Sequence, residues 1–269
     1  MVAQEAVETF MNAFSRRLVG CGLFGSLILL VCWGWAVESV AQTGGGARKS
    51  VDEKSTAASV EAGAGPSSEP LLLGRLKYDQ NNGNDCANVG KALVDLVSKA
   101  CTLNLGGTRT VELASPDLLS FPFLFMNGHD RFQFSERDRQ TLRNYFENGG
   151  FLLASGCCDK PDFPISMRRE LSRLFEGPLF RGRARFERMT YDHLIYRIQH
   201  TVEKVTSLNR KRDIYLEGLF LDGRLVAVLC DEGLCCSFSM GNRCNANRGV
   251  PPEVGPPLAV NIAIYALTH

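Results

Sequence analysis

The fold is decided by SERDRQTLRNYFENGGFLLAS, residues 135–155. Ser135 is a suitable helix N-cap, and Asp138 stands three residues later as its capping-box partner. An apolar stripe follows at helical spacing, formed by Leu142, Tyr145 and Phe146. Gly149-Gly150 ends this helix, because its first glycine readily adopts the left-handed backbone conformation of a helix stop. The apolar run 151–155 follows at once and predicts a buried strand, so the stretch encodes one helix-to-strand step of an α/β fold.

The same alternation of apolar strands and amphipathic helices continues on both sides of this stretch. Further strands are predicted at 71–78, 110–113 and 122–126, and further helices at 89–100 and 167–175. The resulting order, β-α-β-β-α-β-α, favours a mainly parallel sheet that is covered by helices on both faces.

The last third of the chain follows a different pattern. Two apolar runs, 215–221 and 224–230, flank Asp222-Gly223, which is a strong signal for a β-hairpin. A loop rich in Cys, Asn, Gly and Pro comes next, and residues 258–267 predict a closing apolar helix.

Composition excludes some functional classes. The chain has 269 residues, with 30 Lys and Arg against 29 Asp and Glu, so its formal net charge is +1. A uniformly basic nucleic-acid-binding protein needs a lopsided balance, and we expect no nucleic-acid partner. Hydrophobic residues make up 45% of the chain and charged residues 22%, which is typical of a globular protein.

The first 41 residues are interpreted as a signal peptide or an N-terminal membrane anchor. Arg16-Arg17 precede an uncharged run, residues 18–37, and Ser39-Val40-Ala41 offers small residues at a cleavage site. The run is long enough to span a bilayer, so membrane attachment is the alternative to cleavage. Either interpretation predicts an exported, periplasmic or otherwise extracytoplasmic domain. Residues 42–70 form a flexible Gly/Ala/Ser-rich linker, and the folded domain covers 71–269.

Several stretches of this domain resemble one family. They are Ser115–Leu119, Phe121–His129, Leu142–Leu153, Tyr191–His193 and Val260–Leu267. Together they are similar to the DUF4159 domain, a bacterial family of unknown function. The resemblance implies a three-layer flavodoxin-like fold akin to class I glutamine amidotransferases, and it implies no known reaction. Family members often carry acidic residues after the strand that follows Gly-Gly, whereas this chain has Ala154-Ser155-Gly156-Cys157-Cys158-Asp159.

Candidate ligand-binding residues follow the predicted strands. Open α/β sheets bind ligands beyond the carboxyl ends of their strands. Three loops should meet there, 79–85, 127–130 and 155–159. The polar candidates that they supply are Asp79, Asp85, Asn127, Gly128, His129, Asp130 and Asp159.

Cys157 and Cys158 are the candidate nucleophiles, because they follow a buried strand where an amidotransferase-like fold would place its cysteine. Such a thiolate needs a base. The candidate bases and orienting acids are His129 with Asp130, and His193 with Asp192. The sequence lacks a Gly-x-Cys-x-Gly elbow and a late His-x-Glu, which weighs against this hypothesis.

Eight cysteines remain after the N-terminal segment. They are Cys86, Cys101, Cys157, Cys158, Cys230, Cys235, Cys236 and Cys244. In an exported protein they predict disulfides or structural thiols, with a pairing that sequence leaves open. The rival is a metal site on Cys230-x4-Cys235-Cys236-x7-Cys244, which lacks a doubled Cys-x-x-Cys. No phosphate-binding loop is present, and we expect neither a cofactor nor a metal ion.

Three functional hypotheses follow. The leading one is a non-enzymatic module that binds an unknown protein or small-molecule partner, with membrane contact possible through residues 18–37. The alternative is a Cys- or His/Asp-dependent hydrolase, and the second alternative is a metal-binding domain.

Overall fold

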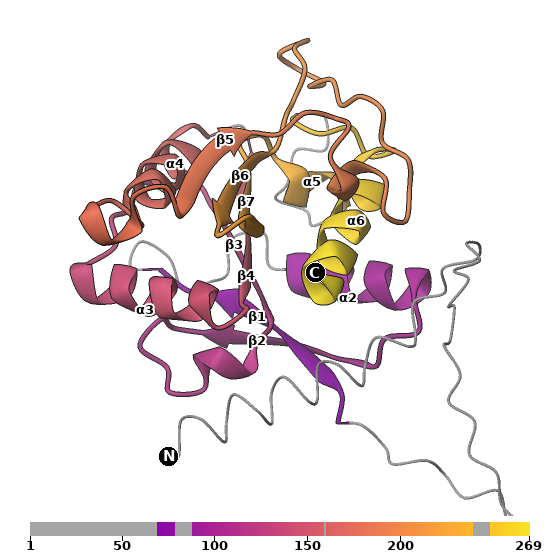
Figure 1. The fold of residues 1–269 in the computed structure, drawn as a ribbon. Coiled ribbons are helices and arrows are strands. Elements are labelled where there is room, and N and C mark those ends of the chain that lie inside the picture. The colour runs from indigo at the N-terminus through magenta and orange to yellow at the C-terminus, as the bar shows by residue number, and fades with distance from the viewer. Residues whose placement is uncertain (1–68, 79–87, 159, 239–247) are drawn as a thin grey trace, which may run out of the picture. The chain divides into compact units, whose positions relative to one another are not determined.

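The computed structural model describes residues 69–78, 88–158, 160–238 and 248–269. Within these ranges the strands form one seven-stranded sheet in the order β2-β1-β3-β4-β7-β6-β5 (Figure 1). The predicted N-terminal segment, 1–41, and the linker up to residue 68 lie outside the described residues. In the described part, no helix is both long and apolar enough to cross a bilayer.

The elements alternate along the chain as the sequence predicts. The strands are β1 (Leu71–Leu76), β2 (Leu105–Val111), β3 (Phe123–Gly128), β4 (Phe151–Gly156), β5 (Ala184–Arg188), β6 (Glu217–Leu221) and β7 (Arg224–Cys230). The α-helices are α2 (Val89–Ala100), α3 (Glu136–Glu147), α4 (Asp162–Arg173), α5 (Leu234–Phe238) and α6 (Gly255–Thr268). Short 3-10 turns lie at Leu118–Ser120, Pro178–Phe180 and Leu194–Tyr196.

The sheet is mixed. β2, β1, β3, β4 and β7 pair in parallel, in that order. β6 and β5 then extend the sheet in antiparallel fashion from β7. The prediction of a mainly parallel α/β sheet is therefore confirmed, with antiparallel strands at the C-terminal side.

Helices cover both faces of the sheet, α2, α5 and α6 on one and α3 and α4 on the other (Figure 1). Successive residues of each strand point to opposite faces. Phe123 and Phe125 of β3 accordingly pack in the core beneath α2 and α6, whereas Leu124 and Met126 pack in the core beneath α3 and α4. Burial on both faces explains why β3 and β4 are almost continuously apolar.

The α3–β4 step forms as residues 135–155 predict. The Ser135 hydroxyl accepts the Asp138 backbone N–H at 3.1 Å, and the Ser135 N–H donates to the Asp138 carboxylate at 3.0 Å, completing the capping box. Gly149 has φ 93°, in the left-handed region. Gly150 is required for a different reason, because a Cβ there would collide with the ring of Tyr145.

The predicted hairpin is also confirmed. Asp222 and Gly223 both have positive φ, 50° and 84°, as a two-residue hairpin turn requires. β6 begins at Glu217, two residues later than the predicted start at Tyr215.

Two further boundaries and two elements differ from the prediction. β2 spans Leu105–Val111 rather than 110–113, because backbone pairing with β1 extends it through Gly106-Gly107, which carry no apolar pattern. α4 begins at Asp162 rather than Met167, with Pro164 in the first turn, where a missing N–H breaks no helical bond. The edge strand β5 and the short helix α5 were not predicted. β5 is charged and mostly exposed, and α5 lies in the expected loop.

Candidate functional site

The candidate site lies at the carboxyl edge of β3, β4 and β7. Asn127 of β3 is in register with Ser155 of β4, and Ser155 is in register with Cys230 of β7. Cys157 directly follows β4, and α5 begins four residues after β7 ends. The parallel pairing of β4 with β7 therefore brings together two cysteine pairs that are far apart in the sequence.

Close packing and hydrogen bonds position these two segments at the ends of β3, β4 and β7. A Cβ on Gly156 would lie only 2.8 Å from the carbonyl oxygen of Asp231, so only glycine fits between the ends of β4 and β7. The Cys157 N–H donates to the Gly128 carbonyl at 3.0 Å, and the Cys235 N–H donates to the Ser155 hydroxyl at 3.4 Å.

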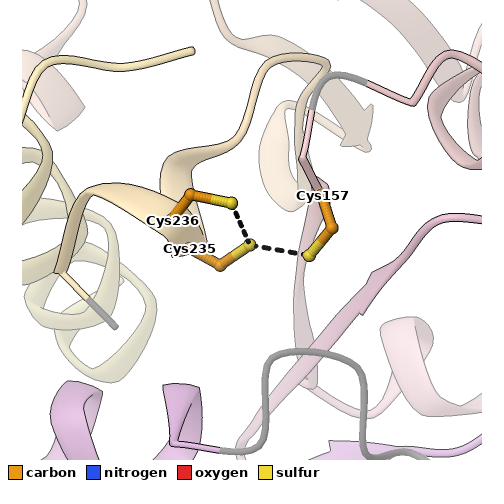
Figure 2. Close-up of side chains that lie close together, drawn as sticks. All are labelled: Cys157, Cys235 and Cys236. Atoms are coloured by element: carbon orange, nitrogen blue, oxygen red, sulfur yellow. Dashed lines mark hydrogen bonds between the residues drawn. The ribbon is translucent and has the colours of Figure 1, made fainter. Parts of the chain in front are cut away.

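Four thiols meet at this edge, and we call Cys157, Cys158, Cys235 and Cys236 the paired-cysteine cluster. The Sγ atoms of Cys157 and Cys235 are 2.9 Å apart. Cys236 Sγ lies 3.9 Å from Cys235 Sγ and 3.9 Å from Cys158 Sγ. Figure 2 shows Cys235 and Cys236 on one helical turn, facing Cys157 across the gap. The sulfurs of Cys157, Cys235 and Cys236 all lie within 4.8 Å of one another.

The cluster is buried on one side and accessible on the other. Cys157, Cys235 and Cys236 are 0%, 2% and 1% exposed, whereas Cys158 is half-buried. Two N–H groups point at the sulfurs. The Asn127 side-chain amide donates to Cys157 Sγ at 3.3 Å, and the Cys158 backbone N–H donates to Cys236 Sγ at 3.4 Å. Hydrogen bonds of this kind favour the charged thiolate over the thiol.

Cys158 also has an unusual backbone. Its φ is 51°, in the left-handed region that residues other than glycine, asparagine and aspartate rarely adopt. Such conformations cluster at functional sites, where the surroundings hold them in place.

The disulfide prediction is not met within the described residues, where no two sulfurs lie at the bonding distance of about 2.0 Å. Cys86 and Cys244 lie outside the described residues. Cys101 donates to the Val97 carbonyl at 3.4 Å. Cys230 donates to the Glu232 carbonyl at 3.1 Å, and burial raises the pKa of its thiol. Cys230 is thus kept as a thiol, and the partners of Cys235 and Cys236 are Cys157 and Cys158 instead.

A comparison with known families identifies this domain. The family model described as Domain of unknown function (DUF4159) matches residues 72–267. The chain belongs to the DUF4159 family. No curated protein matches it. The matched range contains both halves of the paired-cysteine cluster, so the cluster is part of the DUF4159 domain itself.

The other predicted site residues of this DUF4159 domain fall in three places. Asn127 and the buried Gly128 end β3 beside the cluster, followed by the half-buried His129 and the exposed Asp130. A side chain at Gly128 would collide with the Tyr78 hydroxyl, so its role is close packing. The remaining predicted ligand-binding residues, Asp79, Asp85 and Asp159, lie outside the described residues.

His193 and Asp192 lie far from Cys157. The His193 ring contacts the rings of Phe220 and Tyr265, and Tyr265 in turn contacts Phe151, the first residue of β4. Cys157 follows the other end of β4, about 20 Å from Phe151 at the usual rise per residue. The structure therefore does not bring His193 and Cys157 together as a base and nucleophile.

The environment of His193 is that of a structural residue. Its Nδ1 accepts the Ile195 N–H at 3.2 Å and caps the 3-10 turn Leu194–Tyr196. Burial lowers the pKa of His193, although the Asp192 carboxylate opposes this effect. The Asp192 carboxylate accepts the Thr190 hydroxyl, which lowers the pKa of Asp192.

An ion-pair chain, which the sequence pattern did not predict, fixes the segment that leads to Cys235. Arg168 pairs with Glu217 at 2.5 Å and with Asp231 at 3.5 Å. Arg212 pairs with Asp231 at 3.3 Å and with Glu232 at 2.6 Å. The Glu232 side chain is only 1% exposed, so this pair is formed at a buried carboxylate. Asp231 and Glu232 directly precede the turn into α5. These ion pairs therefore hold the Cys235–Cys236 segment in position.

A separate cavity lies at the carboxyl ends of β1 and β2. Its volume is about 240 Å³, and its wall includes the buried side chains of Tyr78, Phe132 and Phe134. Lys77 and Glu112 also line it and form an ion pair at 2.6 Å. This is the edge at which an open α/β sheet binds small molecules.

Proposed function

We propose that this DUF4159 domain binds a soft divalent metal ion, of which Zn²⁺ is the reference case, through the paired-cysteine cluster. The observation that carries the proposal is the convergence of three buried sulfurs within 4.8 Å, from segments 78 residues apart, with Cys158 Sγ 3.9 Å from Cys236 Sγ. Thiolate ligands select soft metals such as Zn²⁺ and Cu⁺ over Mg²⁺ or Ca²⁺.

The distances suit tetrahedral coordination. With Zn–S bonds of about 2.3 Å, the sulfurs of a tetrahedral site lie about 3.8 Å apart. Two of the sulfur–sulfur distances, both at Cys236, are 3.9 Å. Cys157 and Cys235, at 2.9 Å, need to separate by about 0.9 Å to reach that spacing. Small rotations about the Cα–Cβ bonds are sufficient for this change, because each thiol lies at the end of one rotatable bond.

The thiolate form of this cluster requires a cation. Several thiolates cannot share a buried site without a compensating positive charge, because burial penalises each charge and the charges repel one another. A divalent ion supplies that charge and deprotonates its ligands. The N–H groups of Asn127 and Cys158 that point at the sulfurs act as an outer layer which stabilises the thiolates.

A fourth thiolate from Cys158, whose sulfur lies 3.9 Å from Cys236 Sγ but outside the three-sulfur group, would close the site and give it a structural or regulatory role rather than a hydrolytic one. Catalytic zinc keeps one coordination position for water or substrate, and four cysteines fill all positions. The thiol-hydrolase alternative would need His129 as its base, because His129 follows β3 beside the cluster whereas His193 lies at the opposite end of β4 from Cys157.

Cobalt substitution tests the metal proposal. Full-length protein is titrated with Co²⁺ under anaerobic conditions, and the sulfur-to-cobalt charge-transfer band and the visible bands of tetrahedral Co²⁺ are recorded. We expect saturation at about one ion per chain. Cys236→Ser should weaken the charge-transfer band, whereas Cys101→Ser, a half-buried thiol outside the cluster, should leave it unchanged. An octahedral spectrum identical in all three proteins would contradict the proposal.

A second candidate function is small-molecule binding at the cavity beside β1 and β2. It is favoured by the volume of about 240 Å³ and by the aromatic wall of that cavity. A ligand that raises the melting temperature of the wild type should not stabilise Leu113→Trp, because the larger ring would fill the space lined by Leu113. Equal stabilisation of both proteins would exclude this cavity as the binding site.

We also propose the finer fold assignment and the location of the domain. The parallel strand order β2-β1-β3-β4-β7 matches the doubly wound order of flavodoxin-like folds, to which class I glutamine amidotransferases are akin. Export or membrane tethering is supported by Arg16-Arg17, the uncharged run 18–37 and Ser39-Val40-Ala41. Intact-mass measurement of protein expressed with its native N-terminus tests cleavage before Gln42.

A further inference from the structure

We infer that the metal site is sensitive to peroxide, with Cys158 as the sensing thiolate and Cys236 as the thiolate that resolves it. Oxidation would join these two cysteines and release the metal ion. The inference rests on the proposed metal-binding function and adds a mode of regulation to it.

Accessibility singles out Cys158. Cys157, Cys235 and Cys236 are at most 2% exposed, whereas Cys158 is half-buried. Oxidation of a thiolate by peroxide depends on thiolate character and on access to solvent. Metal coordination provides the thiolate character of Cys157, Cys235 and Cys236, and the positive charge of the ion would also favour the thiolate of Cys158, whose sulfur lies 3.9 Å from Cys236 Sγ. Access therefore decides which sulfur reacts first, and it favours Cys158.

Geometry selects Cys236 as the partner. Cys158 makes two contacts with Cys236. Its backbone N–H donates to Cys236 Sγ at 3.4 Å, and its own Sγ lies 3.9 Å from Cys236 Sγ. The left-handed backbone conformation of Cys158, with φ 51°, directs its N–H and its side chain toward Cys236. A strained conformation that surrounding contacts maintain is typical of a functional position.

The chemistry proceeds in two balanced steps, with hydrogen peroxide as the oxidant. In the first, the Cys158 thiolate attacks one peroxide oxygen, the O–O bond breaks, and hydroxide leaves, which gives a sulfenic acid on Cys158. In the second, the Cys236 thiolate attacks the Cys158 sulfur, an S–S bond forms, and a second hydroxide leaves. Two thiolates have lost two electrons, and one peroxide has been reduced to two hydroxide ions.

The consequence for the metal follows from the ligand count. The disulfide removes Cys236 from the three-sulfur group, takes away Cys158 as a possible fourth ligand, and leaves Cys157 and Cys235. Two thiolates are fewer than the three or four protein ligands of known zinc sites. The ion is therefore released, and a dithiol reductant restores the site by thiol–disulfide exchange.

The test treats zinc-loaded, full-length protein with hydrogen peroxide. Zinc release is followed with a chromogenic chelator, and disulfides are located by mass spectrometry of a non-reducing digest. We expect release and a Cys158–Cys236 disulfide to appear together. Cys158→Ser should still bind zinc through three thiolates but release it roughly tenfold more slowly. Cys101→Ser, which removes a half-buried thiol elsewhere, should match the wild type.

The possible failures are distinguishable. Zinc that is bound but released at the same rate from Cys158→Ser, or a disulfide between Cys157 and Cys235, overturns the inference and leaves the metal site intact. Wild-type protein that binds no zinc overturns the proposed function, and the inference with it. If Cys158→Ser does not fold, the wild type is treated with limiting peroxide and a sulfenic-acid probe. Labelling on any cysteine other than Cys158 then overturns the inference.

Discussion

Cys157 Sγ and Cys235 Sγ lie 2.9 Å apart although 78 residues separate them in the chain. The contact exists because β4 has β7, which is distant in sequence, as its parallel neighbour on the side opposite β3. Cys157 directly follows β4, Cys235 follows β7 after a short turn, and the closeness of the strand ends at Gly156 allows the two cysteine pairs to meet.

Asn127 should tune metal affinity without being a ligand. Its side-chain N–H donates to Cys157 Sγ at 3.3 Å, so Asn127→Ala removes a group that stabilises the thiolate. Loss of such an outer hydrogen bond typically lowers metal affinity by about 10–100-fold. Competition with a chelator of known affinity measures the change. Asn148→Ala, at the exposed end of α3, is the matched control and should leave affinity unchanged. Equal affinity in the wild type and Asn127→Ala would contradict this role.

Tyr145 should stabilise the fold without affecting metal binding. Its buried hydroxyl donates to the Phe121 and Phe151 carbonyls at 2.9 and 3.1 Å and accepts the Phe151 N–H at 3.2 Å. Tyr145→Phe leaves these backbone groups with fewer partners and should lower the free energy of unfolding by about 1–3 kcal/mol. Urea denaturation measures this. Tyr265→Phe, at a half-buried ring, should change it by less than about 0.5 kcal/mol.

Mild acid should destabilise the domain through His193. The neutral ring accepts the Ile195 N–H, and burial lowers the pKa of His193 below that of an unfolded histidine, about 6.5. As the pH falls below that value, the unfolded state binds a proton that the folded state resists, so stability declines. His193→Asn keeps a capping group without titrating and should lose less stability between pH 7.5 and 5.5. The free energy of unfolding is measured by urea denaturation at each pH. An equal loss in the wild type and in His193→Asn would exclude His193 as the cause.

The ion pair at Glu232 should contribute more to the stability of the domain than an exposed ion pair does. Arg212→Met deprives the buried Glu232 carboxylate of its closest partner, at 2.6 Å, and should cost about 1–3 kcal/mol of stability. Lys91→Met breaks an exposed pair with Asp95 on α2, and should cost less than about 1 kcal/mol. Equal costs in urea denaturation would show that the ion-pair chain before Cys235 does not stabilise that segment.

Local elements could be predicted because their signals are local. The capping box of Ser135 and Asp138, the Gly149-Gly150 stop and the Asp222-Gly223 turn each depend on a few neighbouring residues, and all three form. β5 was missed because its residues alternate with exposed charges at the sheet edge. The helical start at Asp162 was missed because Pro164 interrupts the pattern.

The candidate site could be predicted only in part. The sequence placed Cys157 and Cys158 after a buried strand, and the structure confirms that position. It gave no sign that Cys235 and Cys236 face them, because strand order is set by packing of the whole sheet. The metal site that the sequence suggests, on Cys230–Cys244, is local in the chain, whereas the described cluster is assembled across β4 and β7.

The metal content of the full-length protein tests the central claim most directly. The protein is purified anaerobically without added metal, and bound metals are measured by inductively coupled plasma mass spectrometry, beside a variant with Cys157→Ser and Cys236→Ser. We predict about one zinc or other soft metal ion per wild-type chain and a loss of most of it in the variant. Less than about a tenth of an ion per wild-type chain, or equal content in both proteins, would contradict the account.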